Sequence, residues 1–296
     1  MAAEILLLGG NGQVGWELSR SLAPVGTVYA VTRRECDVAD LRTLRTLVRT
    51  RRPAIIVNAT AYTAVDKAES EREQAQLINA VVPALLAEEA MASGALLVDY
   101  STDYVFDGSK RGAYLEGDAT GPLGVYGQSK LDGLRAIEAS GCHHLVLRVS
   151  WVYAARGSNF LRTILRLARE REQLSVVADQ FGTPTPAELI ADVTAHCLML
   201  LHNGKGSEGI YHLAPAGETS WHGFAAAIVR EAQAAGIPLK LIPENIRAIT
   251  TADYPTAALR PANSRLDTNK IRTTFGITLP SWESALPRII RESPLS

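Results

Sequence analysis

The sequence predicts an α/β protein with a doubly wound parallel sheet and a smaller C-terminal lobe. Two observations carry this prediction. In the first half of the chain, short apolar segments alternate with longer segments of helical periodicity, the pattern of a parallel sheet covered by helices on both faces. In addition, a glycine-rich turn joins the first apolar segment to the first helical one, as in the Rossmann type of doubly wound sheet.

The alternation assigns the elements in chain order. Apolar runs bounded by turn residues predict strands, and apolar positions that recur every three to four residues predict helices. The expected strands are 5–8, 27–31, 55–58, 96–101 and 144–148. The expected helices between them are 12–22, 40–51, 72–93 and 125–139. Because crossovers between parallel strands are right-handed, the ligand crevice should lie at the carboxyl ends of the strands.

The glycine turn closes the first expected strand. Gly9, Gly12 and Gly15 recur at every third position just before the first expected helix. Such a turn needs glycine because it is tight, because the backbone must approach a pyrophosphate and because the helix must pack on the sheet. The N–H groups of the helix N-terminus then attract phosphate. We expect a bound dinucleotide here; the alternative is a turn with a structural role alone.

The residues after the second strand bear on the choice of dinucleotide. NAD-selective enzymes usually place a carboxylate there, which binds the ribose hydroxyls. This chain has Thr32 and Arg33 instead. Arginine can hold a 2′-phosphate through charge-assisted hydrogen bonds, which favours NADPH over NADH. Arg33 could also simply stack on adenine, so both cofactors stay open.

The pattern loosens after Trp151. Helices are expected at 159–171, 187–202, 220–235, 268–275 and 281–291, with prolines clustered between them. Such segments suit a loop-rich lobe that closes over the crevice and binds the substrate. We therefore predict a dinucleotide-binding domain at 1–149, to which 187–213 returns, and a substrate-binding lobe at 150–186 and 214–296.

Composition narrows the class of partner. The 296-residue chain is 47% hydrophobic and has a formal net charge of −1. A near-neutral balance gives no electrostatic reason to expect nucleic acid or an anionic membrane as a partner. The three cysteines lack CxxC spacing, no apolar run is long enough to cross a bilayer, and the N-terminus does not resemble a secretory leader. These features predict a cytoplasmic protein.

Tyr126 and Lys130 form a Tyr-x-x-x-Lys pair on an expected helix, which places both side chains on one face. A tyrosine with an ordinary pKa of ~10 exchanges protons near neutral pH only if its phenolate is stabilised. An ammonium one turn away supplies part of that stabilisation, and Lys130 can also reach the ribose of a nicotinamide cofactor. We therefore predict an oxidoreductase with Tyr126 as its acid–base group; the alternative is an exposed helix face.

Thr102 stands in a polar stretch that closes the fourth expected strand. The carboxyl end of this strand faces the crevice. A threonine hydroxyl there can donate a hydrogen bond to a substrate carbonyl and polarise it beside Tyr126. Asp107 and Gly108 fit a turn, which would fix Thr102 in place.

Together these motifs resemble the extended short-chain dehydrogenase/reductase group. The longer segments TAVDKAES, STDYVF, YGQSKL and RPANSRLDT resemble, more specifically, the dTDP-4-dehydrorhamnose reductase family, and the similarity runs essentially end to end. The resemblance implies reduction of the C4 ketone of dTDP-6-deoxy-L-lyxo-4-hexulose, a dTDP-sugar, by NADPH or NADH. One departure is Thr60, where the family commonly has alanine.

The resemblance also implies roles for individual residues. Tyr126 would donate the proton, Lys130 would support it, and Thr102 would hydrogen-bond the carbonyl. The sugar would be bound by Val65, Asp103, Tyr104 and Trp151. The dinucleotide would contact Gly12, Gln13, Val14, Asp37, Val38, Ala61, Tyr62 and Thr63. The segments 182–184 and 260–264 would hold the nucleotide diphosphate, with Arg260 supplying positive charge.

A metal and a dimer are two further implications of the resemblance. Some family members dimerise through a Mg²⁺ site built from three glutamates, and Glu17, Glu188 and Glu292 match those positions. Carboxylate oxygen suits Mg²⁺. Because glutamates on helices are usually just solvated and not every member uses the site, the metal and the homodimer both stay open.

Two other functions fit parts of the pattern. A sugar-nucleotide epimerase or dehydratase would share the fold and the Tyr126/Lys130 pair. A dehydratase typically has Asp-Glu after the threonine, where this chain has Asp103-Tyr104, so simple reduction is favoured. A non-catalytic, dinucleotide-binding regulatory subunit would also share the fold; the presence of Thr102, Tyr126 and Lys130 together argues against it.

Overall fold

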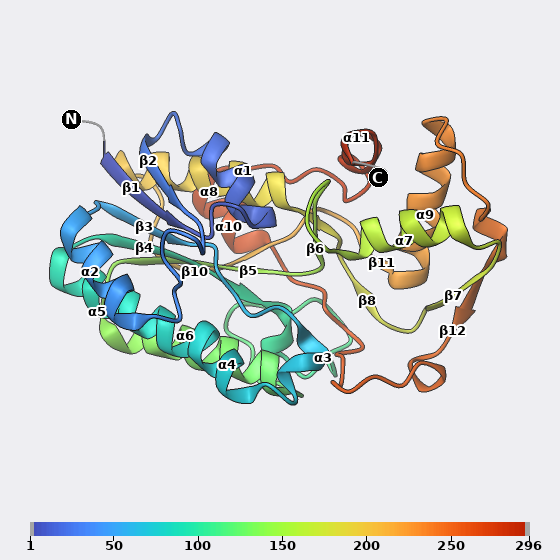
Figure 1. Ribbon diagram of the computed structural model, residues 1–296, viewed down its shortest axis with the longest axis horizontal. Helices are drawn as coiled ribbons and strands as arrows, with labels where there is room; N and C mark the ends of the chain where they lie inside the picture. Colours follow the sequence, from blue (N-terminus) through green and yellow to red (C-terminus); the bar gives the residue numbers. More distant parts are fainter. Residues whose placement is uncertain (1–2, 294–296) are drawn as a thin grey trace.

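A six-stranded parallel sheet forms the centre of the computed structural model, which describes residues 3–293. Its strand order is β10-β5-β4-β3-β1-β2 (Figure 1), and every neighbouring pair is parallel. The strands are β1 (Ala3–Leu8), β2 (Gly26–Val31), β3 (Ile55–Asn58), β4 (Leu96–Thr102), β5 (His144–Val149) and β10 (Gly209–Leu213). The predicted doubly wound sheet is confirmed, and β10 supplies its sixth strand.

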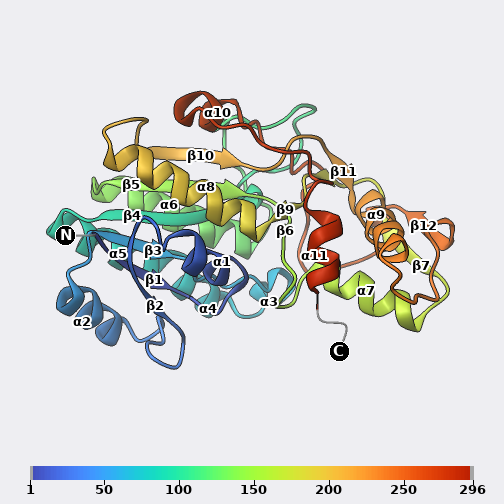
Figure 2. The same ribbon diagram turned by 90° about the horizontal axis from the view of Figure 1, so that it is seen from above.

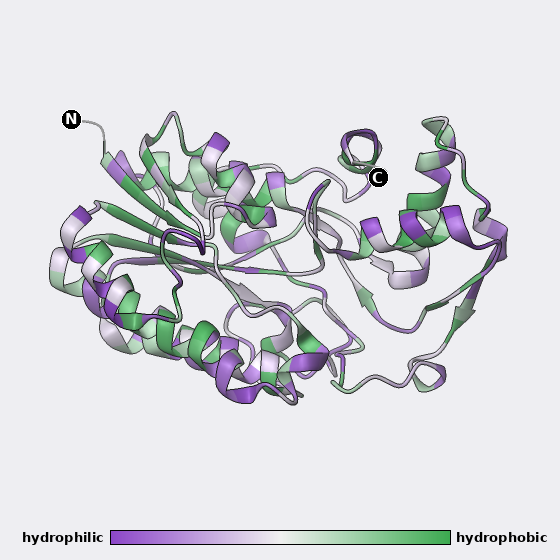
Figure 3. Cartoon of the chain, in the orientation of Figure 1, coloured by the Kyte–Doolittle hydropathy of each residue, from purple (hydrophilic) through white to green (hydrophobic). Residues whose placement is uncertain are grey.

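Helices cover both faces of this sheet (Figures 1 and 2). One face carries α1 (Gln13–Ser21), α8 (Ala187–His202) and α10 (Asn269–Phe275), and the other carries α2 (Leu41–Arg51), α5 (Val82–Ser93) and α6 (Val125–Ser140). A hydrophobic core fills the space on each side of the sheet: the first core lies under α1, α8 and α10, and the second lies under α2, α5 and α6. In β1, the side chains of Ile5 and Leu7 pack into the first core, and those of Leu6 and Leu8 pack into the second. Both faces of the strand are apolar because both are covered, as Figure 3 shows for the central strands.

The predicted helix 72–93 is divided in the structure. α4 (Arg72–Gln76) passes through a π-helical turn, η1 (Leu77–Val81), into α5. Pro83 gives the physical reason, because proline lacks an N–H group and its ring clashes with the carbonyl four residues earlier, that of Asn79. A π turn moves that carbonyl out of the regular ladder, and such turns are frequent at functional sites.

The second lobe has a core of its own. It contains α7 (Phe160–Glu170), α9 (Trp221–Ala234) and α11 (Leu286–Glu292), packed around Phe224 and Ile228. Its strands form three small sheets that pair β6 (Val152–Tyr153) with β9 (Thr185–Pro186), β7 (Leu174–Val177) with β12 (Ile246–Ile249), and β8 (Phe181–Gly182) with β11 (Thr219–Ser220). Short helical turns complete the structure: α3 (Val65–Ala68), η2 (Asp103–Val105), η3 (Pro243–Asn245) and η4 (Thr251–Asp253).

Two segments of the C-terminal part differ from the predicted arrangement. α10 packs Ile271 and Phe275 into the first core, although the segment 214–296 was expected in the substrate-binding lobe. The helix expected at 281–291 begins only at Leu286, next to Pro287 in its first turn, a position that suits proline. Across residues 3–293, none of the helices combines the length and the apolar character needed to span a membrane.

Candidate active site

The glycine turn has the geometry that a pyrophosphate cradle requires. Gly9 has a φ of +79°, which favours glycine, and a Cβ atom on Gly15 would lie 2.0 Å from the carbonyl oxygen of Gly9. Helix α1 can therefore approach the turn closely only with glycine at position 15. Its N-cap is Gly12, so no side chain caps its first N–H groups and its first turn has no acidic residue. These N–H groups are free to receive a phosphate.

A cavity of about 650 Å³ lies beside this turn. It brings together most of the residues predicted to contact a dinucleotide, namely Gly9, Gly12, Arg33, Asp37, Val38, Ala61 and Tyr62. Two further predicted residues are not among those that line this cavity. Gln13 Oε1 accepts a hydrogen bond from Asn159 Nδ2 at 2.8 Å, and Val14 packs against the first core. Thr63 precedes α3, where its carbonyl accepts from the Val65 N–H.

Arg33 is exposed at the edge of the dinucleotide cavity. Its Nε lies 3.1 Å from Asp37 Oδ2, and 78% of its side chain is accessible to solvent. An ion pair this exposed stabilises the protein little. The other N–H groups of the guanidinium stay available to a ligand, so the pair does not prevent Arg33 from binding a 2′-phosphate.

Tyr126 and Thr102 meet at the carboxyl end of β4. Tyr126 lies in the first turn of α6, and the Thr102 side chain is close enough to its hydroxyl to lower the pKa of the phenol. The Tyr104 ring packs edge-on against Tyr126, with ring centroids 5.3 Å apart. Thr102 Oγ1 also donates to Asp103 Oδ1 at 3.1 Å and accepts from the Tyr104 N–H at 3.2 Å. The structure thus brings together residues that the sequence placed on separate elements.

The pKa of Tyr126 is shifted in the direction opposite to the one expected: stabilisation of the phenolate would lower it, and the structure raises it. Burial raises the pKa of Tyr126 to about 12; the nearby Thr102 side chain opposes this rise and the Asp103 carboxylate adds to it. The physical reason is that a buried phenolate loses its hydration. Tyr126 is therefore fully protonated at neutral pH, which is the state that a proton donor requires.

Asp103 is a buried carboxyl group next to Thr102. Burial raises its pKa to about 6, against the opposing hydrogen bonds of Ser264 and Thr102. Its Oδ2 atom has no hydrogen-bond partner within the described residues 3–293. An orphaned acceptor at the sugar site predicted from the sequence is a ready partner for a hydroxyl group, since buried polar atoms are normally paired.

Trp151 adopts a strained backbone conformation. Its φ is +49°, which is uncommon for a residue with a large side chain. Its ring stacks on Trp221 of α9, with centroids 3.6 Å apart and planes at 11°. A Cβ on Gly182 would lie 2.6 Å from the Trp151 ring, so glycine there makes room for it. Strain of this kind is concentrated at ligand-binding sites.

Arg260 joins the second lobe to α3. Its Nη2 lies 2.6 Å from Asp66 Oδ2, next to Val65, while Nη1 is buried and has no hydrogen-bond partner in the part of the chain that the structure describes. Arg260 also lines a cavity of about 410 Å³ with Phe160, Trp221 and Tyr254. A cavity with aromatic walls and an unsatisfied guanidinium fits a base linked to a diphosphate.

The three glutamates of the predicted magnesium site lie near enough for Glu17 and Glu292 to affect Glu188, and an arginine pairs with two of them. Arg288 contacts Glu188 and also lies 3.2 Å from Glu292. Burial raises the pKa of Glu188, the carboxylates of Glu17 and Glu292 raise it further, and Arg288 opposes the rise. Over residues 3–293, no three acidic, histidine or cysteine side chains converge as metal ligands. One chain therefore does not fit the metal, because arginine already supplies the positive charge.

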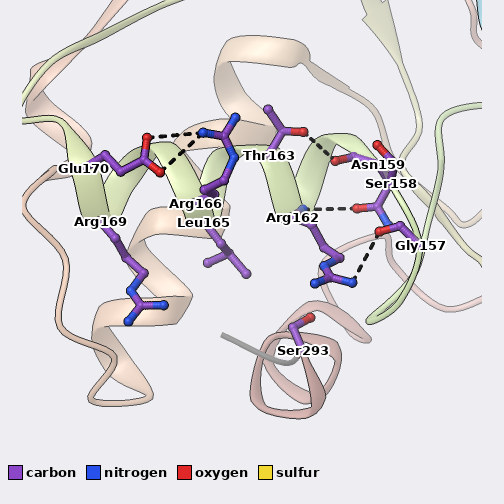
Figure 4. A pocket seen from close by; sticks show the side chains of 10 residues that line it. All are labelled: Gly157, Ser158, Asn159, Arg162, Thr163, Leu165, Arg166, Arg169, Glu170 and Ser293. Atoms are coloured by element: carbon purple, nitrogen blue, oxygen red, sulfur yellow. Dashed lines mark hydrogen bonds and ion pairs between the residues drawn. The ribbon is translucent and has the colours of Figure 1, made fainter. Parts of the chain in front are cut away.

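A further cavity of about 580 Å³ lies along α7, beside Ser293 at the end of α11 (Figure 4). Its side chains include Arg162, whose guanidinium donates to the Gly157 carbonyl, and Arg166, which pairs with Glu170 at 3.2 Å. These contacts are internal to the lobe, and none of the predicted site residues lines this cavity.

Sequence reasoning missed three buried polar residues near the site. Asn79 in the π turn donates to Ser129 Oγ of α6 and forms a pair of hydrogen bonds with the backbone of Tyr62 in the cofactor cavity. Asn58 ends β3, Asp99 lies opposite it in the middle of the adjacent strand β4, and Asn58 donates a hydrogen bond to Asp99. These residues could have been found from the sequence by their position. Polar residues that interrupt or follow an apolar segment near the carboxyl edge of a parallel sheet often contribute to a ligand-binding site.

The comparisons with known proteins agree on one family. The model described as the RmlD substrate binding domain matches residues 3–294. The dTDP-4-dehydrorhamnose reductase of Escherichia coli (strain K12) is 49% identical over 292 residues, which cover 97% of each chain. The crystal structure of dTDP-4-dehydrorhamnose reductase from Bacillus anthracis str. Ames in complex with NADP has a TM-score of 0.89 at 33% identity, covering 99% of this chain and 100% of that one. An ortholog from Clostridium acetobutylicum ATCC 824 has a TM-score of 0.88 at 32% identity, covering 97% and 98%. The chain therefore belongs to the dTDP-4-dehydrorhamnose reductase family.

Proposed function

We propose that the protein reduces the C4 ketone of dTDP-6-deoxy-L-lyxo-4-hexulose to dTDP-L-rhamnose, with NADPH or NADH as the reductant. The observation that carries this proposal is that Tyr126, half-buried and protonated, lies beside Thr102 at the carboxyl end of β4. The family relationship supplies the substrate, and the relative solved with NADP supports the class of cofactor.

The glycine turn and its cavity fit the cofactor. The uncapped start of α1 would hold the pyrophosphate, and Arg33 would hold a 2′-phosphate at the cavity edge. When bound there, NADPH or NADH supplies the hydride that reduces C4. Since Arg33 is exposed and its partner Asp37 could also accept ribose hydroxyls, the site accommodates both cofactors.

Tyr126 donates its phenolic proton to the C4 oxygen as negative charge develops there. Thr102 has one hydroxyl proton, which points to Asp103 in the structure. A bound ketone oxygen could accept a hydrogen bond from this hydroxyl in place of Asp103. Thr102 and Tyr126 then hold the same oxygen from two directions, the arrangement that stabilises a developing alkoxide.

The substrate would extend from this point into the second lobe. Trp151 offers a flat apolar face to the deoxysugar, and Asp103 Oδ2 offers an acceptor for a sugar hydroxyl. The cavity that contains Arg260 and Trp221 would receive the nucleotide, with the guanidinium on the diphosphate. The predicted residues Val65 and Tyr104 lie on the two turns, α3 and η2, at the border between the lobes.

The test is a reductase assay with purified protein. Supplying the 4-keto sugar nucleotide should cause steady oxidation of NADPH, with the signal proportional to enzyme concentration. Cofactor oxidation that does not depend on the sugar nucleotide, or none at micromolar protein, would exclude the reductase function. An epimerase or dehydratase would convert the sugar without net consumption of cofactor.

The state of the protein in solution is a separate part of the proposal. We place the enzyme in the cytoplasm, where its three buried, unpaired cysteines would stay reduced. We also propose a homodimer, by analogy with the family, in which Arg288 rather than a metal balances the charge of Glu188 and Glu292. Sedimentation equilibrium in the presence of a chelator tests this; a monomer under those conditions would contradict it.

A further inference from the structure

We infer that Asp99 is a positioning residue for Lys130: its buried carboxylate holds the Lys130 ammonium at the active site. The inference rests on the proposed function, because it concerns how Lys130 supports Tyr126. Asp99 lies on β4, three residues before Thr102, and Lys130 lies on α6, one turn after Tyr126. The pair therefore joins the two elements that carry the proton donor and its partner.

The geometry of the pair is that of a buried ion pair. Lys130 Nζ lies 3.8 Å from Asp99 Oδ2. Lys130 is 4% exposed and Asp99 is 3% exposed, so water screens neither charge. The other carboxylate oxygen, Oδ1, accepts a hydrogen bond of 2.6 Å from Asn58 Nδ2 on the neighbouring strand β3. Asn58 is itself 1% exposed, so a buried partner holds the carboxylate oxygen that does not face the ammonium.

Charge balance gives Asp99 its role. A lysine buried without a counter-charge gives up its proton, because the apolar surroundings penalise the ammonium. Burial raises the pKa of Asp99 above its ordinary value, and Lys130 and the Asn58 hydrogen bond limit that rise by favouring the carboxylate. Each group thus stabilises the charged form of the other. Removing Asp99 would leave the buried Lys130 ammonium without its counter-charge and free to move, and the developing Tyr126 phenolate would lose the positive charge positioned for it.

The network continues to the cofactor cavity. Asn58 Oδ1 accepts hydrogen bonds from the Thr60 hydroxyl at 2.5 Å and from the Thr60 N–H at 3.2 Å. Thr60 lines the dinucleotide cavity, and its methyl group lies against Gly9. A continuous chain of contacts therefore links the cofactor loop through Asn58 and Asp99 to Lys130. This chain sets where Nζ stands relative to the cofactor cavity.

The test is a double-mutant cycle on the full-length enzyme with Asp99→Asn and Lys130→Met. Asparagine keeps the size of Asp99 and an acceptor for Asn58 but removes the charge. Asp99→Asn alone should lower kcat by at least about tenfold with little change in the KM for the sugar nucleotide. In the Lys130→Met background, the same substitution should cost less than about twofold, because the residue acts through Lys130. Equal losses in both backgrounds, or an unchanged kcat, would overturn the inference.

A stability cycle on the same four proteins adds a readout that does not need activity. Asp99→Asn should lower the urea midpoint when Lys130 is present and raise it in the Lys130→Met background, where Asp99 is a lone buried charge. The same sign in both backgrounds would overturn the pairing. As a matched control, Tyr100→Phe removes another buried hydrogen bond from β4, that of the tyrosine hydroxyl to Thr194, and should leave kcat unchanged.

These measurements separate the two proposals. A wild-type protein without reductase activity overturns the proposed function and with it the positioning role. An active wild-type protein with an additive cycle overturns the role of Asp99 alone.

Discussion

Tyr126 at the start of α6 lies beside Thr102 at the end of β4, close enough for the threonine side chain to oppose the rise in the Tyr126 pKa. This contact places a protonated phenol and a threonine hydroxyl where they can hold the same substrate oxygen. It also explains why burial of the phenol is compatible with catalysis, because the reductive direction begins from the protonated tyrosine. The predictions below follow from this arrangement and from the charges around it.

Replacing Tyr126 by phenylalanine removes the proton and keeps the ring. The variant should lose about 100-fold or more in kcat, the usual scale for a general acid, while its affinity for NADPH stays nearly unchanged. Steady-state kinetics and cofactor titration measure the two effects. Tyr153→Phe is the matched control, since its hydroxyl is buried without a partner in the described chain and its loss should leave kcat intact. Near-normal kcat in Tyr126→Phe would remove the residue from its assigned role.

Arg33→Ala should weaken NADPH more than NADH. A charge-assisted hydrogen bond to a 2′-phosphate is worth ~2 kcal/mol, so the ratio of the two dissociation constants should shift by at least about tenfold. The remaining Asp37 carboxylate would then repel the phosphate, which adds to the effect. The neighbouring Arg34→Ala serves as the control. If both cofactors lose affinity equally in Arg33→Ala, this arginine does not bind the 2′-phosphate.

Asp103 makes the stability of the protein depend on pH. Its pKa rises from 3.8 to about 6 on folding, so the folded state holds the proton more tightly than the unfolded state. The stabilising contribution is complete below pH ~4 and is lost as the pH rises through ~6. Asp103→Asn should therefore be more stable than the wild type by ~2 kcal/mol at pH 7, and this difference should shrink at pH 4. Urea unfolding at both pH values measures it, and a difference independent of pH would contradict the assignment.

Arg288 pairs with Glu188 and Glu292, two of the three glutamates predicted to bind Mg²⁺, so its removal should leave their charge to be balanced by a cation. Arg288→Met leaves Glu188 beside Glu17 and Glu292 without a balancing cation and should lower stability by ~1–3 kcal/mol. Added Mg²⁺ should restore part of this loss in the variant. The wild-type melting temperature should respond to neither Mg²⁺ nor chelator. A wild-type protein that melts much earlier in chelator would show that the glutamates bind a metal after all.

Much of this architecture could be predicted because it depends on patterns among residues that are close together in the sequence. The period of apolar residues located the five strands of the first half to within one or two positions, and the spacing of Gly9, Gly12 and Gly15 identified the turn before α1. The Tyr126/Lys130 spacing likewise needs only one helix. Each of these features depends on neighbours in the sequence.

The rest depends on contacts between distant segments. The pairing of Asp99 with Lys130 exists only because β4 and α6 pack together, and the π turn at Asn79 reflects a clash caused by Pro83. The direction of the Tyr126 pKa depends on burial, which sequence spacing does not give. In the same way, Arg288 reaches Glu188 from α11, so the family resemblance implied a metal site at a position where the fold places an ion pair.

The most direct test of the reductase function follows the hydride itself. The 4-keto sugar nucleotide is incubated with the enzyme and NADPH that carries deuterium at the transferred position, and the product is analysed by NMR. We predict dTDP-L-rhamnose with one deuterium at C4 and an equal amount of oxidised cofactor. A product without deuterium at C4, or conversion of the sugar without net cofactor oxidation, would contradict the reduction that we assign to Tyr126 and Thr102.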